Sequence, residues 1–239
     1  MRPTFRNLNE SFEGWAYRSG LSRRIADLEK ERYLERRNRT DRICKLTAKG
    51  RERALGGRDP KVQWERPWDG WWRLVCFDVP VARNRQRNQL RYYLRSKWFG
   101  LLQRSIWISP DPVQEEARQM RRTTVEAKSL VLLEARTCGG ESDAHVVASA
   151  WNFQRINKLY GDHLKILEKP AVAKVTTKNQ AKVLLRWTQA EHRAWTDAIR
   201  ADPLLPKVLL PDDYLGRRAW ERRVQVMELA GAAVKRFVA

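Results

Sequence analysis

Arginine side chains gather in two short stretches of this sequence, and they carry its clearest chemistry. The guanidinium group keeps its positive charge and holds a fork of N–H donors, which can clamp a phosphate or the edge of a guanine base. One stretch opens a predicted helix and the other surrounds a polar turn. We interpret both as DNA-contacting surfaces rather than as a solvated basic face, which is the simpler alternative. The residues are Ser22, Arg23 and Arg24, with Asp27 one turn further along, and Arg36, Arg37, Asn38, Arg39 and Arg42.

Asp78 is the one acidic residue between positions 71 and 110, and it follows a predicted strand. A carboxylate there could bind a metal ion for a nuclease, but metal-assisted hydrolysis needs more carboxylates nearby. We therefore predict that Asp78 caps a turn, and that the protein uses no metal and no cofactor. The other candidates have no partner at a recognisable spacing, so we expect them to be structural or exposed: His145, His163, His192, Cys44, Cys76 and Cys138.

The first segment of the chain is predicted to position the arginines. Leu21, Ile25 and Leu28 recur at the spacing of one helical stripe, which predicts a helix there. Two strand-like pieces, at about 33–37 and 42–47, flank the polar turn and precede a second short helix. Helix, hairpin with a basic tip and helix is the order of a winged helix-turn-helix domain. In such a domain the helix reads the major groove, while the hairpin touches the backbone or the minor groove.

The middle of the chain alternates predicted strands and helices, which is typical of a ferredoxin-like α+β domain. In its first helix, Leu90 and Leu94 are predicted to face inward while arginines recur every four residues. From about residue 146 the chain is predicted to be mainly helical, with later helices at about 179–200 and from about 216 and a proline-bounded segment at 203–211 between them. The middle elements are, in order, a strand at 72–79, a helix at 83–97, a strand at 101–108, a helix at 112–126 and a strand at 130–135, with a fourth strand not placed.

The overall charge agrees with a polyanionic partner. The chain has 239 residues, with 48 Lys and Arg against 28 Asp and Glu, which gives +20 at pH 7. Residues 1–70 have a surplus of seven positive charges, from 18 Lys and Arg against 11 Asp and Glu. Residues 71–110 also have a surplus of seven, from 8 Lys and Arg against 1 acidic residue. A surplus of this size usually indicates nucleic acid or an anionic membrane surface. No apolar run approaches the roughly 20 residues that span a bilayer, and the start resembles no signal peptide. We therefore expect a soluble, cytoplasmic protein.

Several stretches resemble one known family. They are Trp72-Arg73-Leu74-Val75 with Phe77-Asp78-Val79-Pro80, continuing to Phe99-Gly100-Leu101-Leu102 and Ile106-Trp107-Ile108-Ser109-Pro110; Leu46-Thr47-Ala48-Lys49-Gly50-Arg51; Ala150-Trp151 through Tyr160; and Arg200-Ala201-Asp202-Pro203-Leu204-Leu205-Pro206 with Leu209-Leu210-Pro211-Asp212-Asp213. The two proline-bracketed leucine pairs at the end are the most specific feature. On these residues, the sequence resembles the PaaX-type transcriptional repressors of phenylacetic acid degradation over nearly its whole length.

The resemblance implies both an organisation and a function. It implies a winged-helix DNA-binding domain at 1–57, a linker at 58–70, a ferredoxin-like domain at 71–145 and a helical C-terminal domain at 146–239. It also implies a nucleoid-associated homodimer that binds double-stranded DNA and represses transcription. In the family, an acyl-coenzyme A effector releases the protein from the DNA. The sequence departs from the family in two places. It begins near the family's second helix, and Asp213-Tyr214-Leu215-Gly216 stands where the family tends to have Trp-Pro-Gly.

Two other functions remain open at this point. One is a metal-dependent nuclease built on the ferredoxin-like domain, with Asp78 as a metal ligand. The other is a nucleic-acid-binding module that holds DNA without choosing its sequence. Cleavage of DNA or RNA with magnesium would identify the first, and equal affinity for all duplex sequences would identify the second.

Overall fold

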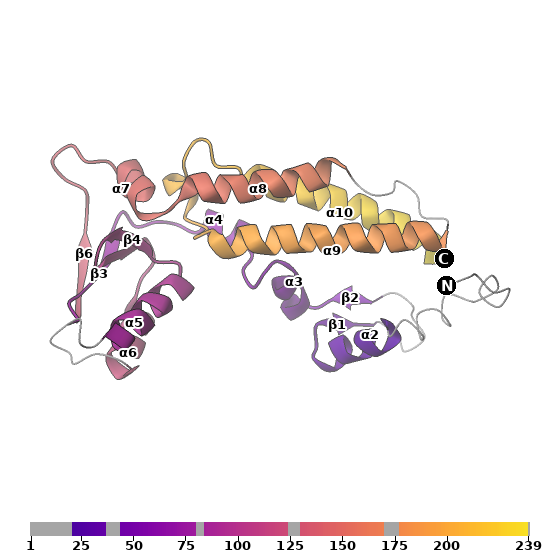
Figure 1. Ribbon diagram of the computed structural model, residues 1–239, viewed down its shortest axis with the longest axis horizontal. Helices are drawn as coiled ribbons and strands as arrows, with labels where there is room; N and C mark the ends of the chain where they lie inside the picture. The colour runs from indigo at the N-terminus through magenta and orange to yellow at the C-terminus, as the bar shows by residue number, and fades with distance from the viewer. Residues whose placement is uncertain (1–20, 37–43, 80–83, 124–129, 170–176, 239) are drawn as a thin grey trace. The chain divides into compact units, whose positions relative to one another are not determined.

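The structure is a computed structural model that describes residues 21–36, 44–79, 84–123, 130–169 and 177–238 (Figure 1). It is a mixed fold of helices and antiparallel sheets, which confirms the predicted α+β class. The chain divides into two compact units. Unit 1 comprises Met1–Asp59, Ala171–Leu185 and Met227–Ala239, and unit 2 comprises Pro60–Pro170 and Arg186–Val226. Among the described residues, no helix is both long enough and apolar enough to cross a membrane.

Unit 1 contains the helices and the hairpin predicted for the first segment. The elements are α2 (Leu21–Lys30), β1 (Leu34–Glu35), β2 (Lys45–Leu46) and α3 (Ala48–Ala54). The strands β1 and β2 pair antiparallel, with Leu34 opposite Leu46. Helix α2 ends because Arg32 adopts a left-handed conformation (φ 61°) and the Tyr33 N–H returns to the Leu28 carbonyl over 2.8 Å. This reversal leads the chain from α2 directly into β1.

Helix α3 begins at a side-chain cap and packs tightly at a glycine. The Thr47 hydroxyl accepts a hydrogen bond from the Gly50 N–H at 3.0 Å, as expected of an N-cap threonine. Gly50 is buried, and a Cβ placed on it would lie 2.0 Å from the Tyr33 carbonyl oxygen. No side chain fits into that space, so Gly50 allows α3 to dock against the chain that leaves α2.

Unit 2 holds a four-stranded antiparallel sheet in the order β4-β5-β3-β6. The predicted single strand at 101–108 is wrong, because the chain reverses there at Arg104 and Ser105 and forms two paired strands. This hairpin supplies the fourth strand that the sequence did not place. The elements are β3 (Trp72–Phe77), α5 (Asn84–Ser96), β4 (Gly100–Gln103), β5 (Ile106–Ser109), α6 (Gln114–Thr123) and β6 (Leu130–Ala135).

The two faces of this sheet belong to different cores. On one face, Val75 and Phe77 of β3 pack with Leu90 and Leu94, which confirms the predicted inward face of α5, and with Met120 of α6. The opposite face of the sheet packs against the aromatic core of the helical region through Trp72 and Ile108. Helices α5 and α6 therefore cover one side of the sheet only (Figure 1).

The helical region confirms most of the predicted helices and adds one. Residues 58–70, predicted as a linker, contain helix α4, whose Trp64 side chain is only 5% exposed in the core of unit 2. A proline at the first helical position and a large apolar side chain one turn later account for this element. The helices are α4 (Pro60–Glu65), α7 (Asp143–Ala150), α8 (Phe153–Glu168), α9 (Lys178–Ala201) and α10 (Gly216–Val238), with a 3₁₀ turn at Lys207–Leu209.

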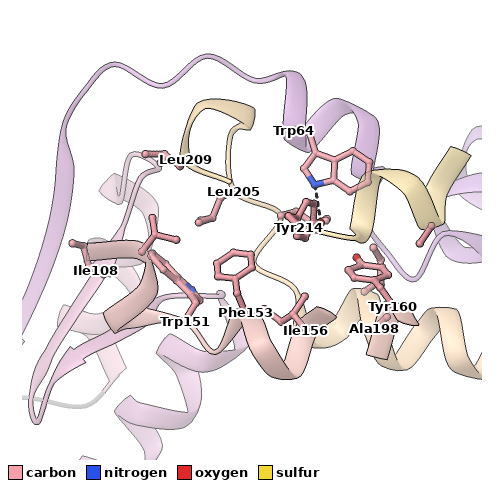
Figure 2. Packing of buried hydrophobic residues seen from close by; sticks show 14 of the residues in the cluster. Trp64, Ile108, Trp151, Phe153, Ile156, Tyr160, Ala198, Leu205, Leu209 and Tyr214 are labelled. Atoms are coloured by element: carbon pink, nitrogen blue, oxygen red, sulfur yellow. Dashed lines mark hydrogen bonds between the residues drawn. The ribbon is translucent and has the colours of Figure 1, made fainter. Parts of the chain in front are cut away.

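Asp202 is the polar centre of the aromatic core. Its buried carboxylate accepts hydrogen bonds from Tyr160 at 2.6 Å, from Tyr214, and from the Leu204 N–H at 2.8 Å. The indole of Trp64 donates in turn to the Tyr214 oxygen, as the dashed line in Figure 2 shows. Burial first, and then the charge of Asp202, raises the pKa of both tyrosines above the ordinary value, so both hydroxyls stay protonated and donate. The proline–leucine motif around Asp202 is therefore built into the core.

Candidate nucleic-acid interface

Helix α2 presents its predicted DNA-contacting side chains to solvent. Arg23 and Arg24 lie in its first turn and are exposed, as is Asp27 one turn later. Ile25 is half-buried, which fixes the side of the helix that faces unit 1. Ser22 also lies in the first turn, although its side chain is outside the described part. The first turn of α2 therefore offers two guanidinium groups that a nucleic acid could reach.

Arg36 joins the hairpin to α2. It follows β1, and its Nε lies 2.6 Å from Oε1 of Glu29 on α2. A hydrogen bond with the Cys44 side chain, together with the charge of Glu29, raises the pKa of the Arg36 guanidinium above its ordinary value. Arg36 therefore stays charged and helps to fix the hairpin against α2. The other hairpin residues predicted to touch DNA, Arg37, Asn38, Arg39 and Arg42, lie outside the described residues.

Two further cations strengthen the same part of unit 1. The Lys49 ammonium donates to the Glu31 carbonyl at 2.9 Å and lies 4.4 Å from the centre of the Tyr33 ring. Arg51 donates to the Leu46 carbonyl at 3.1 Å. Both cations come from α3 and bind the ends of α2 and β2. The sequence indicates no role for either cation beyond their position in the motif Lys49-Gly50-Arg51.

Asp78 is exposed just beyond the end of β3. It lines a hollow of about 480 Å³ together with Phe77 and residues 103–106 of the β4–β5 hairpin. The acidic, histidine and cysteine side chains of the described residues nowhere gather in a group of three that could hold a metal ion. Asp78 is the one acidic residue in the lining of this hollow.

Another hollow of unit 2 combines cations with aromatic rings. It has a volume of about 330 Å³ and lies between α4, the 3₁₀ turn and the start of α10. Its cations come from all three of these elements, and two tryptophans contribute to its lining. The lining residues are Lys61, Lys207, Arg217, Trp64, Trp220, Glu65 and Glu221. Such a lining suits a ligand that carries both negative charge and a flat ring.

His163 is structural, as expected, and it has an acidic partner that its sequence spacing did not indicate. Its side chain is fully buried on α8, and its Nε2 lies 2.9 Å from Oε1 of Glu191 on α9. The same oxygen accepts a hydrogen bond from Arg223 of α10 at 2.7 Å, and the guanidinium lies over the Trp195 ring. These groups fasten three helices together, which is a structural role. His145 and His192 are exposed, as expected.

Comparison with known proteins agrees with this architecture. Residues 65–147 match the PaaX protein central Cas2-like domain, and residues 151–239 match the PaaX-like protein C-terminal domain. Among solved structures, the chain is similar to an uncharacterized protein, Rv0674 from Mycobacterium tuberculosis. The TM-score is 0.52 and the identity 20%, over 92% of this chain and 82% of that one, which shows a shared fold. No curated protein matches the sequence.

The two matched domains, one built on the sheet and one on the helices, define a class of proteins that are generally transcription regulators. The chain belongs to the PaaX-like family, as its sequence motifs predict.

Proposed function

We propose that this protein is a transcription regulator that binds a specific sequence of double-stranded DNA, acts as a homodimer in the cytoplasm and represses its target genes. The exposed pair Arg23 and Arg24 in the first turn of α2, beside a two-stranded hairpin, is the observation that carries this proposal. Membership of the PaaX-like family supports it, because the family consists mainly of regulators.

In this proposal, unit 1 is a winged helix and the sheet of unit 2 is a ferredoxin-like domain. The succession of α2, hairpin and α3 supports the winged helix, and the strand order β4-β5-β3-β6 with two helices on one face supports the ferredoxin-like domain. Helix α2 reads base edges in the major groove, and the hairpin contacts phosphates. Arg37, Asn38, Arg39 and Arg42 supply the phosphate contacts, while Arg36 holds the hairpin to α2 through Glu29.

The two kinds of contact predict different effects of substitution. DNA sequences selected by the purified protein would first supply the preferred site. On that site, Arg23→Ala or Arg24→Ala should cost about 1–3 kcal/mol of binding free energy and relax the preference at one base pair. Arg39→Ala should instead weaken binding to every sequence almost equally. The measurement is fluorescence anisotropy on the selected duplex and on its single-base variants.

The same experiment separates the regulator from the non-specific module. If both α2 variants lose affinity uniformly and keep the wild-type base preferences, α2 is not the reading element. If selection recovers no preferred sequence at all, the protein holds DNA without choosing it.

We further propose that an acyl-coenzyme A effector binds the hollow lined by Lys61, Lys207 and Arg217 and releases the DNA. The three cations can bind the phosphates of coenzyme A, and the half-buried indole of Trp220 can stack on its adenine. The hollow lies in unit 2 and α2 lies in unit 1. Effector binding would therefore have to change DNA binding indirectly, through the residues between them.

Removing the three cations of the hollow tests this assignment. In a variant with Lys61→Gln, Lys207→Gln and Arg217→Gln, we expect the concentration of coenzyme A thioester that releases half of the DNA to rise roughly tenfold or more, a change of about 1.4 kcal/mol or more. An α8 control variant removes the same charge from exposed positions, with Arg155→Gln, Lys158→Gln and Lys169→Gln. An equal rise in both variants, or no release of the wild type by any thioester, would refute the assignment.

A further inference from the structure

Helix α5 carries a row of arginines that the proposed winged helix does not use. Arg87, Arg91 and Arg95 follow one another at intervals of four residues, so they lie on one side of the helix and rise by about 6 Å each. Helix α5 contains no acidic residue. Its neighbouring row consists of Asn84, Asn88 and Tyr92, which are exposed and can also donate hydrogen bonds.

Among the described residues, this row lies on the flank of α5 that the contacts to α6 do not involve. Contacts to α6 occupy the other flank of α5, where the Tyr93 hydroxyl donates to Gln119 at 2.9 Å and Lys97 lies 3.7 Å from Glu116. The arginine row lies on the opposite flank, since Arg91 and Tyr93 point some 160° apart around a helix of 3.6 residues per turn. Among the described contacts, the acidic side chains of α6 therefore do not pair with the arginine row.

Two of the arginines are partly enclosed by the fold, and the third lies against an aromatic ring. Arg87 and Arg91 are half-buried, and the Nε–H of each is buried without a hydrogen-bond partner among the described residues. The Arg95 guanidinium lies 5.7 Å from the centre of the Trp107 ring, which supports its stem against the sheet. None of the three forms an ion pair within the described chain. A row that is fixed in this way loses little conformational entropy when an anion binds, which distinguishes it from flexible surface lysines.

We propose that the arginine row of α5 is a second DNA-binding surface, which contacts the phosphates of a duplex without reading bases. Duplex DNA presents one negative charge per roughly 1.7 Å of its axis, so a rigid row of three cations meets several phosphates at once. Two alternatives fit less well. A membrane-binding helix needs a free apolar face, whereas Leu90 and Leu94 are buried in unit 2. Single-stranded nucleic acid is bound by several stacking rings, and Tyr92 is the one strongly exposed aromatic residue of α5, at 76%.

Salt dependence of duplex binding tests the proposal in the full-length protein. Each phosphate contact adds about 0.9 to the slope of log affinity against log salt. A variant with Arg87→Gln, Arg91→Gln and Arg95→Gln should therefore lower that slope by about 2 to 3 on a duplex of random sequence, and on the selected duplex as well. The base preferences should stay as in the wild type. The α8 control variant loses the same charge and should keep the wild-type slope.

This inference rests on the proposed binding of DNA, but the experiment can refute it while the proposed function stands. If Arg39→Ala flattens the slope and the α5 variant does not, the winged helix binds DNA and the α5 row does not. If the α5 and α8 variants lower the salt slope equally, the proposal is also refuted, because the loss of net charge alone would explain both results. The single substitution Arg95→Glu changes the exposed member of the row and leaves the half-buried Arg87 and Arg91 in place, so it guards against misfolding and should also lower the slope. A stronger effect of the α5 variant on duplex RNA or on anionic vesicles than on DNA would assign the row to that partner instead.

Discussion

Replacing Glu191 with alanine should lower the free energy of unfolding by about 3–5 kcal/mol, since it removes one partner of a buried ionic network. The Glu191 carboxylate is fully buried and accepts hydrogen bonds from His163 at 2.9 Å and Arg223 at 2.7 Å. Without it, the partly buried guanidinium of Arg223 and the fully buried imidazole of His163 lose their common acceptor, and three helices lose their shared contact. Urea unfolding at neutral pH measures the loss.

Two comparisons make this prediction specific. Asp162→Ala breaks the exposed Asp162–Lys165 pair on α8 and should change stability little, because solvent screens such pairs. Replacing the network as a whole, with Glu191→Leu, His163→Leu and Arg223→Met, should recover much of the stability, because apolar groups of similar volume leave no stranded charge. A triple variant as unstable as Glu191→Ala would show that packing, not charge, explains the loss.

The same carboxylate should make the protein sensitive to acid. Burial alone raises the pKa of Glu191, but the hydrogen bond from His163 and the charge of Arg223 outweigh burial and hold the pKa below its ordinary value. Glu191 therefore contributes stability above the pKa of an unfolded glutamate, and this contribution is lost as the pH falls through the lower folded value. Stability measured from pH 7 downward should decline less steeply in Glu191→Gln than in the wild type.

The second large effect is expected at Gly50. Alanine is the better helix former by roughly 1 kcal/mol in an exposed helix, so Gly50→Ala would stabilise α3 if the helix stood alone. In unit 1 the added Cβ would lie 2.0 Å from the Tyr33 carbonyl oxygen, which is backbone and cannot rotate away. We therefore expect α3 to separate from the turn after α2, with a cost of about 1–3 kcal/mol or more. DNA binding should fall accordingly, as anisotropy would show.

Gly161 in α8 is the matched control. It is also a glycine inside a helix, but the nearest atom to an added Cβ is the Leu215 Cδ1, 4.0 Å away. Gly161→Ala should therefore stabilise unit 2 by roughly 0.5–1 kcal/mol and leave DNA binding unchanged. Hydrogen exchange of α2 and α3 distinguishes the two positions, since only Gly50→Ala should increase it. Unchanged exchange in Gly50→Ala would contradict the tight packing at Tyr33.

Features encoded by neighbouring residues could be predicted from the sequence. The spacing of Leu90 and Leu94 predicts the buried face of α5, and β6 occupies the predicted residues 130–135. The reversal at Arg104 and Ser105 could not be predicted, because the turn contains no glycine, proline, asparagine or aspartate and apolar residues continue on both sides. Its backbone conformation, with Arg104 at φ 32°, depends on strand pairing across the sheet.

Contacts between distant residues were likewise hidden from the sequence. Arg36, which follows β1, contacts Glu29 on α2, and His163 contacts Glu191, 28 positions further along the chain. Neither spacing is a known motif, because the partners lie on separate elements that only the tertiary fold brings together. The exposure of Arg23 and Arg24 agrees with the periodicity of α2, although Leu28 of the predicted apolar stripe is 40% exposed.

The aromatic core gives the two units different optical properties. All but one of the eleven tryptophans belong to unit 2, and the exception is Trp15. Indole fluorescence of the protein therefore reports almost entirely on unit 2. There Trp64, Trp72 and Trp195 are buried among other aromatic rings. Local melting of α2 or the hairpin should leave the emission nearly unchanged, while loss of the sheet or the helices should shift it to longer wavelength. A change of emission on adding duplex DNA would then originate mainly in unit 2, where Arg95 already lies over the ring of Trp107.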